Sequence, residues 1–157
     1  MELRIKSDSS KITKKLGFLF GKILNSATII GLTGDLGTGK TVFVSGLAEG
    51  MQIPKNNYVH SPTFSILNVY KGIKNLYHLD LYRIKESYDL EFTGFYDFAG
   101  KDGVTAIEWY DNLLDIEIEI DIKVEIKYLG ENKREIIVTF KSTREDFNNI
   151  ALQARME

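Results

Sequence analysis

Residues 34–41 read Gly34-Asp35-Leu36-Gly37-Thr38-Gly39-Lys40-Thr41, and they fill every required position of the phosphate-binding pattern G-x-x-x-x-G-K-[ST]. A strand-like apolar run precedes them at 27–32, and apolar residues at helical spacing follow over 41–51. Strand, glycine-rich loop and helix are the context that this pattern requires. Glycines let successive backbone N–H groups wrap an anion at a helix start, where the helix dipole favours negative charge. The alternative is a glycine-rich turn without a ligand, which the complete pattern and its flanks disfavour.

The chemistry of this pattern assigns separate roles to its last two residues. Lys40 would reach the β- and γ-phosphates of a bound nucleotide, and the Thr41 hydroxyl would bind Mg²⁺. The sequence therefore predicts a nucleoside triphosphate site with a magnesium ion.

The composition is that of an ordinary globular domain, and we expect a single domain over residues 1–157. Of these residues, 43% are hydrophobic and 27% are charged, and the net charge of −2 gives no general attraction to nucleic acid or anionic membrane. The absence of cysteine excludes disulfides and thiolate metal sites. Residues 1–6 are no signal peptide, and no stretch approaches the length of a membrane span. We therefore expect a cytoplasmic protein without a membrane partner.

The rest of the chain divides into short helices and strands. Apolar residues at helical spacing predict a helix over 12–23, with N-cap candidates at 8–10. A turn at 71–75 joins two strand-like runs, so we expect an antiparallel hairpin there. The other expected elements are a helix at 86–91, a strand at 104–109 and a C-terminal helix from about residue 143.

The longest regular pattern lies near the C-terminus. Every second residue from 116 to 128 is apolar, which predicts a long, half-exposed, antiparallel strand. Residues 129–133 turn the chain, and 136–140 form the returning strand. The stretch Asn132-Lys133-Arg134-Glu135 resembles the guanine-reading N-K-x-D. It has glutamate in place of aspartate and lies in a hairpin turn, which argues against GTP.

Three polar residues occupy positions where a nucleotide site takes its metal and water ligands. Asp80 and Glu108 each end an apolar strand, and ligands of open α/β sheets bind beyond the carboxyl ends of the strands. Thr63 lies after the phosphate-loop helix, where nucleotide hydrolases often place a threonine on Mg²⁺ and the γ-phosphate. The alternatives are a structural cap for Asp80 and a surface strand end for Glu108. We interpret all three as candidate catalytic residues, and Asp80 and Glu108 also as candidate metal ligands.

Several other residues have two readings. Thr13, near the start of the first helix, either meets the nucleotide base or is a solvated hydroxyl. Arg83 is either a phosphate-facing cation or the partner of an acidic neighbour. His60 and His78 share no metal spacing, and we interpret both as structural or surface residues. The aromatic stretch 92–98 is interpreted as core or as partner surface.

Four motifs stand in order along the chain: GDLGTGKT from Gly34, SPTFSILNVY from Ser61, YHLDLYR from Tyr77 and AIEW from Ala106. Together they resemble the TsaE family, the P-loop ATPases of bacterial threonylcarbamoyladenosine (t6A) tRNA modification, over roughly residues 8–140. The resemblance implies a three-layer α/β domain of the P-loop NTPase kind, with a mixed parallel and antiparallel sheet. It also implies ATP or ADP and Mg²⁺ as ligands.

The resemblance carries family roles to individual positions. Thr63 matches the switch threonine, Asp80 the Walker-B-like aspartate and Glu108 the metal-associated glutamate, with Trp109 as the tryptophan that follows it. A basic residue of the last hairpin, Lys133 or Arg134, would lie near the adenine. The positions that match the phosphate loop are Asp35, Leu36, Gly37, Thr38, Gly39, Lys40 and Thr41.

The resemblance also implies partners. The family acts with TsaB and TsaD, and TsaD transfers threonylcarbamoyl to adenosine 37 of tRNA. The TsaE-like protein binds and hydrolyses ATP to support this machinery, so it would reach tRNA only indirectly. Two other functions remain open from the residues alone. One is a small P-loop nucleoside kinase, although no arginine-rich lid segment is present. The other is a nucleotide-dependent binding switch.

Overall fold

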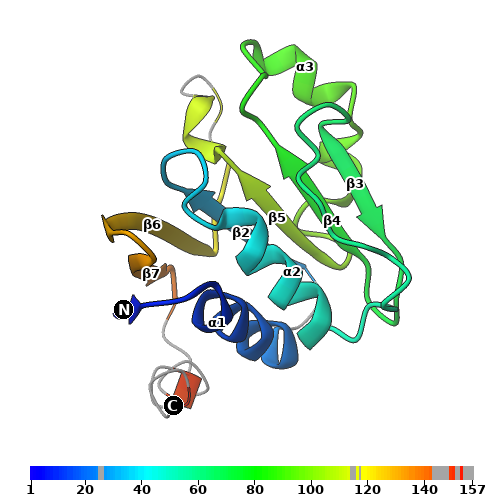
Figure 1. Ribbon diagram of the computed structural model, residues 1–157. Coiled ribbons are helices and arrows are strands. Elements are labelled where there is room, and N and C mark those ends of the chain that lie inside the picture. Colours follow the sequence, from blue (N-terminus) through cyan, green and yellow to red (C-terminus); the bar gives the residue numbers. More distant parts are fainter. Residues whose placement is uncertain (25–26, 114–115, 117, 143–148, 151–152, 154–157) are drawn as a thin grey trace.

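A computed structural model of the chain has one seven-stranded sheet with helices on both faces (Figure 1). It describes residues 1–24, 27–113, 116, 118–142, 149–150 and 153. The strands are β1 (Glu2–Ser7), β2 (Thr28–Thr33), β3 (Leu67–Tyr70), β4 (Leu76–Asp80), β5 (Val104–Glu108), β6 (Ile122–Gly130) and β7 (Lys133–Phe140). The helices are α1 (Ser10–Ile23), α2 (Lys40–Gly50), α3 (Ser87–Glu91) and α4 (Phe95–Phe98), with a 3-10 turn at Tyr110–Asn112.

The sheet is mixed, as the expected hairpin and the family resemblance implied. Its order is β1-β7-β6-β2-β5-β4-β3, with β4, β5, β2 and β6 parallel and the other three strands antiparallel to their neighbours. The predicted hairpin of β3 and β4 is confirmed. Because β2, β5 and β4 run in the same direction, their carboxyl ends meet at one edge of the sheet. There Asp80 lies directly opposite Glu108, in the β4–β5 register.

Two hydrophobic clusters, one on each face of the sheet, hold the three layers together. On the face covered by α1 and α2, helix residues such as Phe20 and Leu47 belong to the same cluster as Ile30 and Val124 of the sheet. On the opposite face, α3 and α4 contribute Leu90, Phe95 and Phe98, which cluster with Leu79 and Ile107. Figure 1 shows α1 and α2 side by side across the sheet.

The two main helices touch at their backbones. A Cβ atom at Gly17 of α1 would lie 2.1 Å from the carbonyl oxygen of Phe43, and one at Gly46 of α2 would lie 2.0 Å from that of Lys14. Neither position has room for a side chain. The glycines therefore fix how closely α2, the helix that follows the phosphate loop, lies against α1.

The prediction of a long antiparallel strand from residue 116 was wrong about where the strand begins and about its direction relative to one neighbour. β6 begins at Ile122 and is antiparallel to β7 but parallel to β2. In the parallel pairing of β2 with β6, Ile30 lies opposite Ile122. Because β2 begins two residues earlier, at Thr28, it has no residue that could pair with the chain before Ile120. Ile116, Ile118 and Ile120 instead pack on the second cluster without a partner strand, which explains their apolar alternation.

The first residues form a strand that was not expected from the sequence. β1 pairs antiparallel with β7 at the edge of the sheet, from Glu2 opposite Thr139 to Ser7 opposite Arg134. The predicted C-terminal helix from about residue 143 lies almost entirely outside the described residues. No helix among those described is long and apolar enough to cross a membrane.

Candidate functional site

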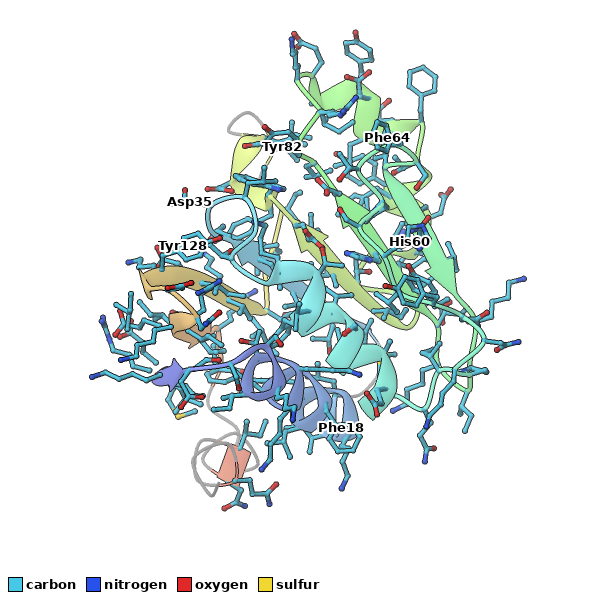
Figure 2. The ribbon with its side chains drawn as sticks, viewed as in Figure 1. Phe18, Asp35, His60, Phe64, Tyr82 and Tyr128 are labelled. Carbon is cyan, nitrogen blue, oxygen red and sulfur yellow. The ribbon has the colours of Figure 1, made fainter. Side chains whose placement is uncertain are left out.

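The glycine-rich loop connects β2 to the start of α2, as predicted. Gly34, Gly37 and Gly39 have φ values of 138°, 77° and 115°, a region that other residues rarely adopt. A Cβ atom at Gly34 would also lie 2.3 Å from the carbonyl oxygen of Ile126. No side chain caps the first turn of α2, so its free N–H groups can bind an anion. Figure 2 shows Asp35 on this loop between Tyr128 and Tyr82.

Lys40 is held inside the loop. Its ammonium group donates to the carbonyl oxygens of Gly34 at 2.6 Å and Asp35 at 3.0 Å, and it lies 4.0 Å from the centre of the Trp109 ring. Burial lowers the pKa of Lys40, and the nearby carboxylates of Glu108 and Asp80 offset this only in part. The loop therefore keeps a partly desolvated cation beside the position that phosphates would take.

Glu108 connects the end of β5 to two other elements. Its Oε1 accepts a hydrogen bond from the Thr41 hydroxyl at 2.9 Å and lies 2.8 Å from Nε2 of His78. Glu108 and His78 are both buried. His78 was not expected at the site and was interpreted from the sequence as a structural or surface residue. A usable signal was present, because strand alternation places His78 on the same face of β4 as Asp80, two residues later.

Asp80 is hydrogen-bonded to the segment 61–63, which carries Thr63, the predicted switch threonine. Ser61 Oγ and Thr63 Oγ1 lie 2.8 and 2.9 Å from Asp80 Oδ2, and 2.8 Å from each other. The two hydroxyl groups have one hydrogen each, so only two of these three close contacts are hydrogen bonds at any one time. Asp80 Oδ1 accepts a hydrogen bond from the backbone of Tyr82 at 2.8 Å. Ser61 was not among the residues singled out from the sequence.

These groups line a common hollow of about 340 Å³ at the carboxyl edge of the sheet. Its lining includes Lys40, Thr41, Thr63, Asp80, Glu108 and Trp109. No three His, Asp or Glu side chains in the described part of the chain gather to hold a metal by themselves. Mg²⁺ is usually bound by one or two carboxylates together with substrate phosphates, so the donors present fit Mg²⁺ that arrives with a nucleotide.

A smaller hollow of about 150 Å³ lies on the other side of the loop. Thr13 and Arg134 line it, and it shares Gly37, Gly39 and Val42 with the larger hollow. The Thr13 hydroxyl is buried and lies 3.0 Å from that of Ser7, so the solvated reading of Thr13 is wrong.

The last hairpin presents its two adjacent basic residues differently. Arg134 Nε donates to the carbonyl oxygen of Thr38 at 3.0 Å, and its guanidinium lies over the ring of Tyr128. Lys133 is exposed and is not part of the lining of either hollow. Of the site residues expected from the sequence, Lys133 and Asp35 are not in the lining of either hollow, although the backbone carbonyl of Asp35 accepts a hydrogen bond from Lys40.

Contacts and burial bear on the two alternatives given for Arg83 and for the aromatic stretch 92–98. The Arg83 guanidinium lies 4.5 Å from the centre of the Phe64 ring, and in the described part of the chain it makes no ion pair. In the aromatic stretch 92–98, Phe95 and Phe98 are core residues whereas Phe92 is 86% exposed. The core interpretation is therefore confirmed for Phe95 and Phe98, and partner surface stays a prediction for Phe92.

Comparison with known proteins gives one consistent family. The model of the family described as "Threonylcarbamoyl adenosine biosynthesis protein TsaE" matches residues 7–136. The chain is 35% identical over 136 residues to the tRNA threonylcarbamoyladenosine biosynthesis protein TsaE of Treponema pallidum, covering 87% of this chain and 99% of that protein. It is 36% identical over 130 residues to the protein of the same name from Aquifex aeolicus, covering 82% and 90%.

The fold has a counterpart among solved structures. The crystal structure of Bacillus subtilis YdiB matches with a TM-score of 0.72 and 28% identity, covering 98% of this chain and 94% of that one. The fold is thus of the P-loop kind, which is typical of nucleotide-binding proteins. Fold, phosphate loop and relatives agree, and the chain belongs to the TsaE family of threonylcarbamoyl adenosine biosynthesis proteins.

Proposed function

We propose that this protein is a cytoplasmic, Mg²⁺-dependent ATPase subunit that supports t6A modification of tRNA by a TsaB–TsaD-type complex. It does not transfer the threonylcarbamoyl group itself. The observation that carries the ATPase part is the convergence of Lys40, Thr41, Asp80 and Glu108 on one hollow beside the phosphate loop. The family's printed description supports the pathway. The partners and the indirect access to tRNA rest on the family resemblance.

The two hollows suggest how ATP is placed. The adenine occupies the smaller one, between Thr13 and Arg134, and the phosphates follow residues 35–41 into the larger one. Lys40 leaves its carbonyl partners for the phosphates, because a charged phosphate oxygen is the stronger acceptor. Mg²⁺ supplies charge neutralisation at the transferred phosphoryl group. Thr41, Asp80 and Glu108 are the residues that would hold it.

Glu108 is the best placed residue to orient the attacking water. Its Oε1 is taken by Thr41 and His78, and no bond to Oε2 is found among the described residues. Oε2 is therefore the oxygen left to accept a hydrogen bond from water. Because Glu108 lines the hollow that would take the phosphates, a water bonded to Oε2 would lie on the side of the hollow, within reach of a γ-phosphate bound there.

We infer that the isolated chain hydrolyses ATP slowly and that a partner completes the site. Large exposed side chains lie beside the hollow: Phe64, which follows Thr63, is 86% exposed, and about half of Tyr82, whose ring is tilted against that of Trp109, is exposed. Aromatic residues of this kind are enriched at protein interfaces. A partner seated on them would exclude water from the phosphates.

A nucleotide-dependent binding switch is the second candidate. Asp80 already accepts hydrogen bonds from the Ser61 and Thr63 segment, so Thr63 must move away from Asp80 before it can contact a γ-phosphate. Such a movement alone would signal the bound nucleotide. A nucleoside kinase has less support, because Arg83 stacks on Phe64 and no cationic lid is found among the described residues.

Product analysis tests the proposal. The chain is incubated with Mg²⁺–ATP alone, with a mixture of nucleosides, and with a TsaB–TsaD-type complex, and phosphate and nucleotide products are measured. Free phosphate that increases on addition of the complex supports the ATPase subunit. A phosphorylated nucleoside would instead identify a kinase. Tight binding of ATP without turnover, even with the complex present, would identify a switch.

A further inference from the structure

Among the described residues, His78 is the one buried ionisable side chain beside the site that the proposed reaction has not used. It stands in β4 opposite Ala106 of β5 and is completely buried. Nε2 lies 2.8 Å from Glu108 Oε1. A carboxylate can only accept a hydrogen bond, so Nε2 carries the hydrogen and donates it to Glu108.

The other ring nitrogen has no such role. Nδ1 of His78 is buried and has no hydrogen-bond partner in the described part of the chain. Burying an unpaired polar atom is unfavourable, and an apolar side chain at this position would avoid that cost. The bond to Glu108 is therefore what the imidazole contributes here beyond packing.

The geometry at Glu108 shows what this bond controls. Oε1 receives hydrogen bonds from two separate elements, Thr41 of α2 and His78 of β4. Two donors on one oxygen fix the rotation of the carboxylate and direct Oε2 away from them. Thr41 belongs to the phosphate loop and has its own part in metal binding, whereas His78 lies behind Glu108 and outside the lining of the hollow.

We propose that His78 is a positioning residue, which through Nε2–H holds the Glu108 carboxylate in the orientation that presents Oε2 to the attacking water. It contacts neither nucleotide nor metal. This inference rests on the ATPase function proposed above. It predicts that loss of the donor lowers turnover and leaves nucleotide binding nearly unchanged.

The kinetic test compares two replacements of the same residue. His78→Phe keeps a flat ring of similar size but has no donor, whereas His78→Gln carries an amide N–H of similar reach. We expect His78→Phe to lower kcat about 10- to 100-fold, the usual effect of losing a group that orients an active-site ligand, with KM changed less than about twofold. His78→Gln should recover most of kcat. The matched control is His60→Phe, because His60, labelled in Figure 2, is the other histidine of the chain. It is exposed and is bonded to Asn68 rather than to Glu108.

A spectroscopic test does not depend on turnover. The chain has two histidines, so ¹⁵N-labelled histidine gives two sets of ring signals in NMR. We expect one Nε2–H proton protected from exchange with water, absent in His78→Gln and lost or shifted in Glu108→Ala, with the His60 signals unchanged.

Each outcome decides a separate question. Wild-type kcat in His78→Phe, or equal kcat in the Phe and Gln variants, would overturn the positioning role. An Nε2–H signal indifferent to Glu108→Ala would overturn the contact itself, even if a variant is too unstable for kinetics. If the wild-type chain releases no phosphate with or without partners, the ATPase proposal fails, while the NMR signal still decides whether His78 holds Glu108.

Discussion

At the scale of single residues, the charged groups of the site make hydrogen bonds, but no ion pair between Lys40 and a carboxylate is found among the described residues. Lys40 is bonded to two backbone carbonyl oxygens and faces the Trp109 ring, and neither contact neutralises its charge. Glu108 is bonded to the Thr41 hydroxyl and the His78 imidazole, and Asp80 is bonded to hydroxyl groups and a backbone N–H. Both carboxylates are close enough to Lys40 to raise its pKa, against the larger effect of burial. A phosphate with its metal would supply the missing charges of both signs, which is why this arrangement suits Mg²⁺–ATP.

Replacing Lys40 by alanine should weaken ATP binding strongly. A hydrogen bond to a charged group contributes roughly 1.5–3 kcal/mol, so we expect affinity to fall by about 10- to 150-fold. Thr41→Ala should instead reduce Mg²⁺-dependent hydrolysis more than Mg²⁺-free binding. Calorimetry measures both affinities, and fluorescence of Trp109, the single tryptophan, gives an independent signal next to Lys40. Lys6→Ala, at an exposed position of β1, is the control. Wild-type affinity in Lys40→Ala would contradict the assignment of the site.

At the scale of elements, the hairpin of β6 and β7 braces the phosphate loop from outside. The Tyr128 hydroxyl donates to the carbonyl oxygen of Leu36 at 3.2 Å, and Arg134 donates to that of Thr38. Arg134 also lines the smaller hollow. The hairpin therefore both supports the loop and forms a wall of the proposed adenine site.

The two adjacent basic residues of this hairpin provide a matched comparison. Arg134→Ala should lower ATP affinity about tenfold, corresponding to the loss of roughly 1.5 kcal/mol from a charged hydrogen bond, whereas Lys133→Ala should leave it unchanged. Titration with inorganic triphosphate separates the two roles of Arg134. If Arg134 acts on the base, triphosphate binding is unaffected, and if it braces the loop, both ligands bind more weakly. Equal effects of the two substitutions would contradict the proposed adenine position.

The close contact between α1 and α2 predicts that a Gly→Ala substitution in α2 destabilises the protein, the opposite of its usual effect in a helix. In a helix interior, Gly→Ala normally stabilises by about 0.5–1 kcal/mol. At Gly46 the added methyl group would collide with the carbonyl oxygen of Lys14, and such overpacking typically costs about 1–3 kcal/mol. We therefore expect Gly46→Ala to lower the free energy of unfolding, measured by urea titration. Lys11→Ala, at an exposed position of α1, should change it by less than about 0.5 kcal/mol. A stabilised Gly46→Ala variant would show that the helices lie further apart.

At the scale of the whole molecule, the segment from Ser61 to Ile66 joins the hollow to the exposed aromatic surface. Its inner end is bonded to Asp80, Phe64 points outward, and Ile66 has a φ of 67°, which is strained for a branched side chain. Movement of Thr63 towards a γ-phosphate would change this surface. The segment can thus connect the nucleotide state with partner binding.

We therefore expect ATP and the TsaB–TsaD-type complex to strengthen each other's binding. Coupling between two sites is reciprocal, and typical coupling changes affinity by about 5- to 150-fold. The complex should bind more tightly with a non-hydrolysable ATP analogue than with ADP, and Thr63→Ala should reduce the difference. Calorimetry with each nucleotide measures both directions of the coupling. Identical partner affinity with the analogue, with ADP and without nucleotide would contradict it.

The sequence by itself determined the features that depend on local pattern. The phosphate loop with its strand and helix, the β3–β4 hairpin and the two carboxylates at strand ends were all predictable, because turn chemistry, apolar periodicity and strand ends are encoded within a few residues. Asp80 and Glu108 line one hollow, as their strand-end positions suggested, and Thr63, expected from analogy with nucleotide hydrolases, lines it with them. The mixed sheet followed from combining the hairpin with the family resemblance.

Only the tertiary structure decided which of these residues touch. His78 reaches Glu108, and Ser61 reaches Asp80, through contacts between segments 19 to 30 residues apart. The start of β6 at Ile122 and the pairing of β1 were likewise set by neighbours distant in sequence. Periodicity tells which side chains share a face of a strand, but register, strand order and helix spacing arise from packing of the whole chain. For the same reason, the sequence left Lys133 and Arg134 equivalent, and the folded hairpin turned Arg134 alone towards the site.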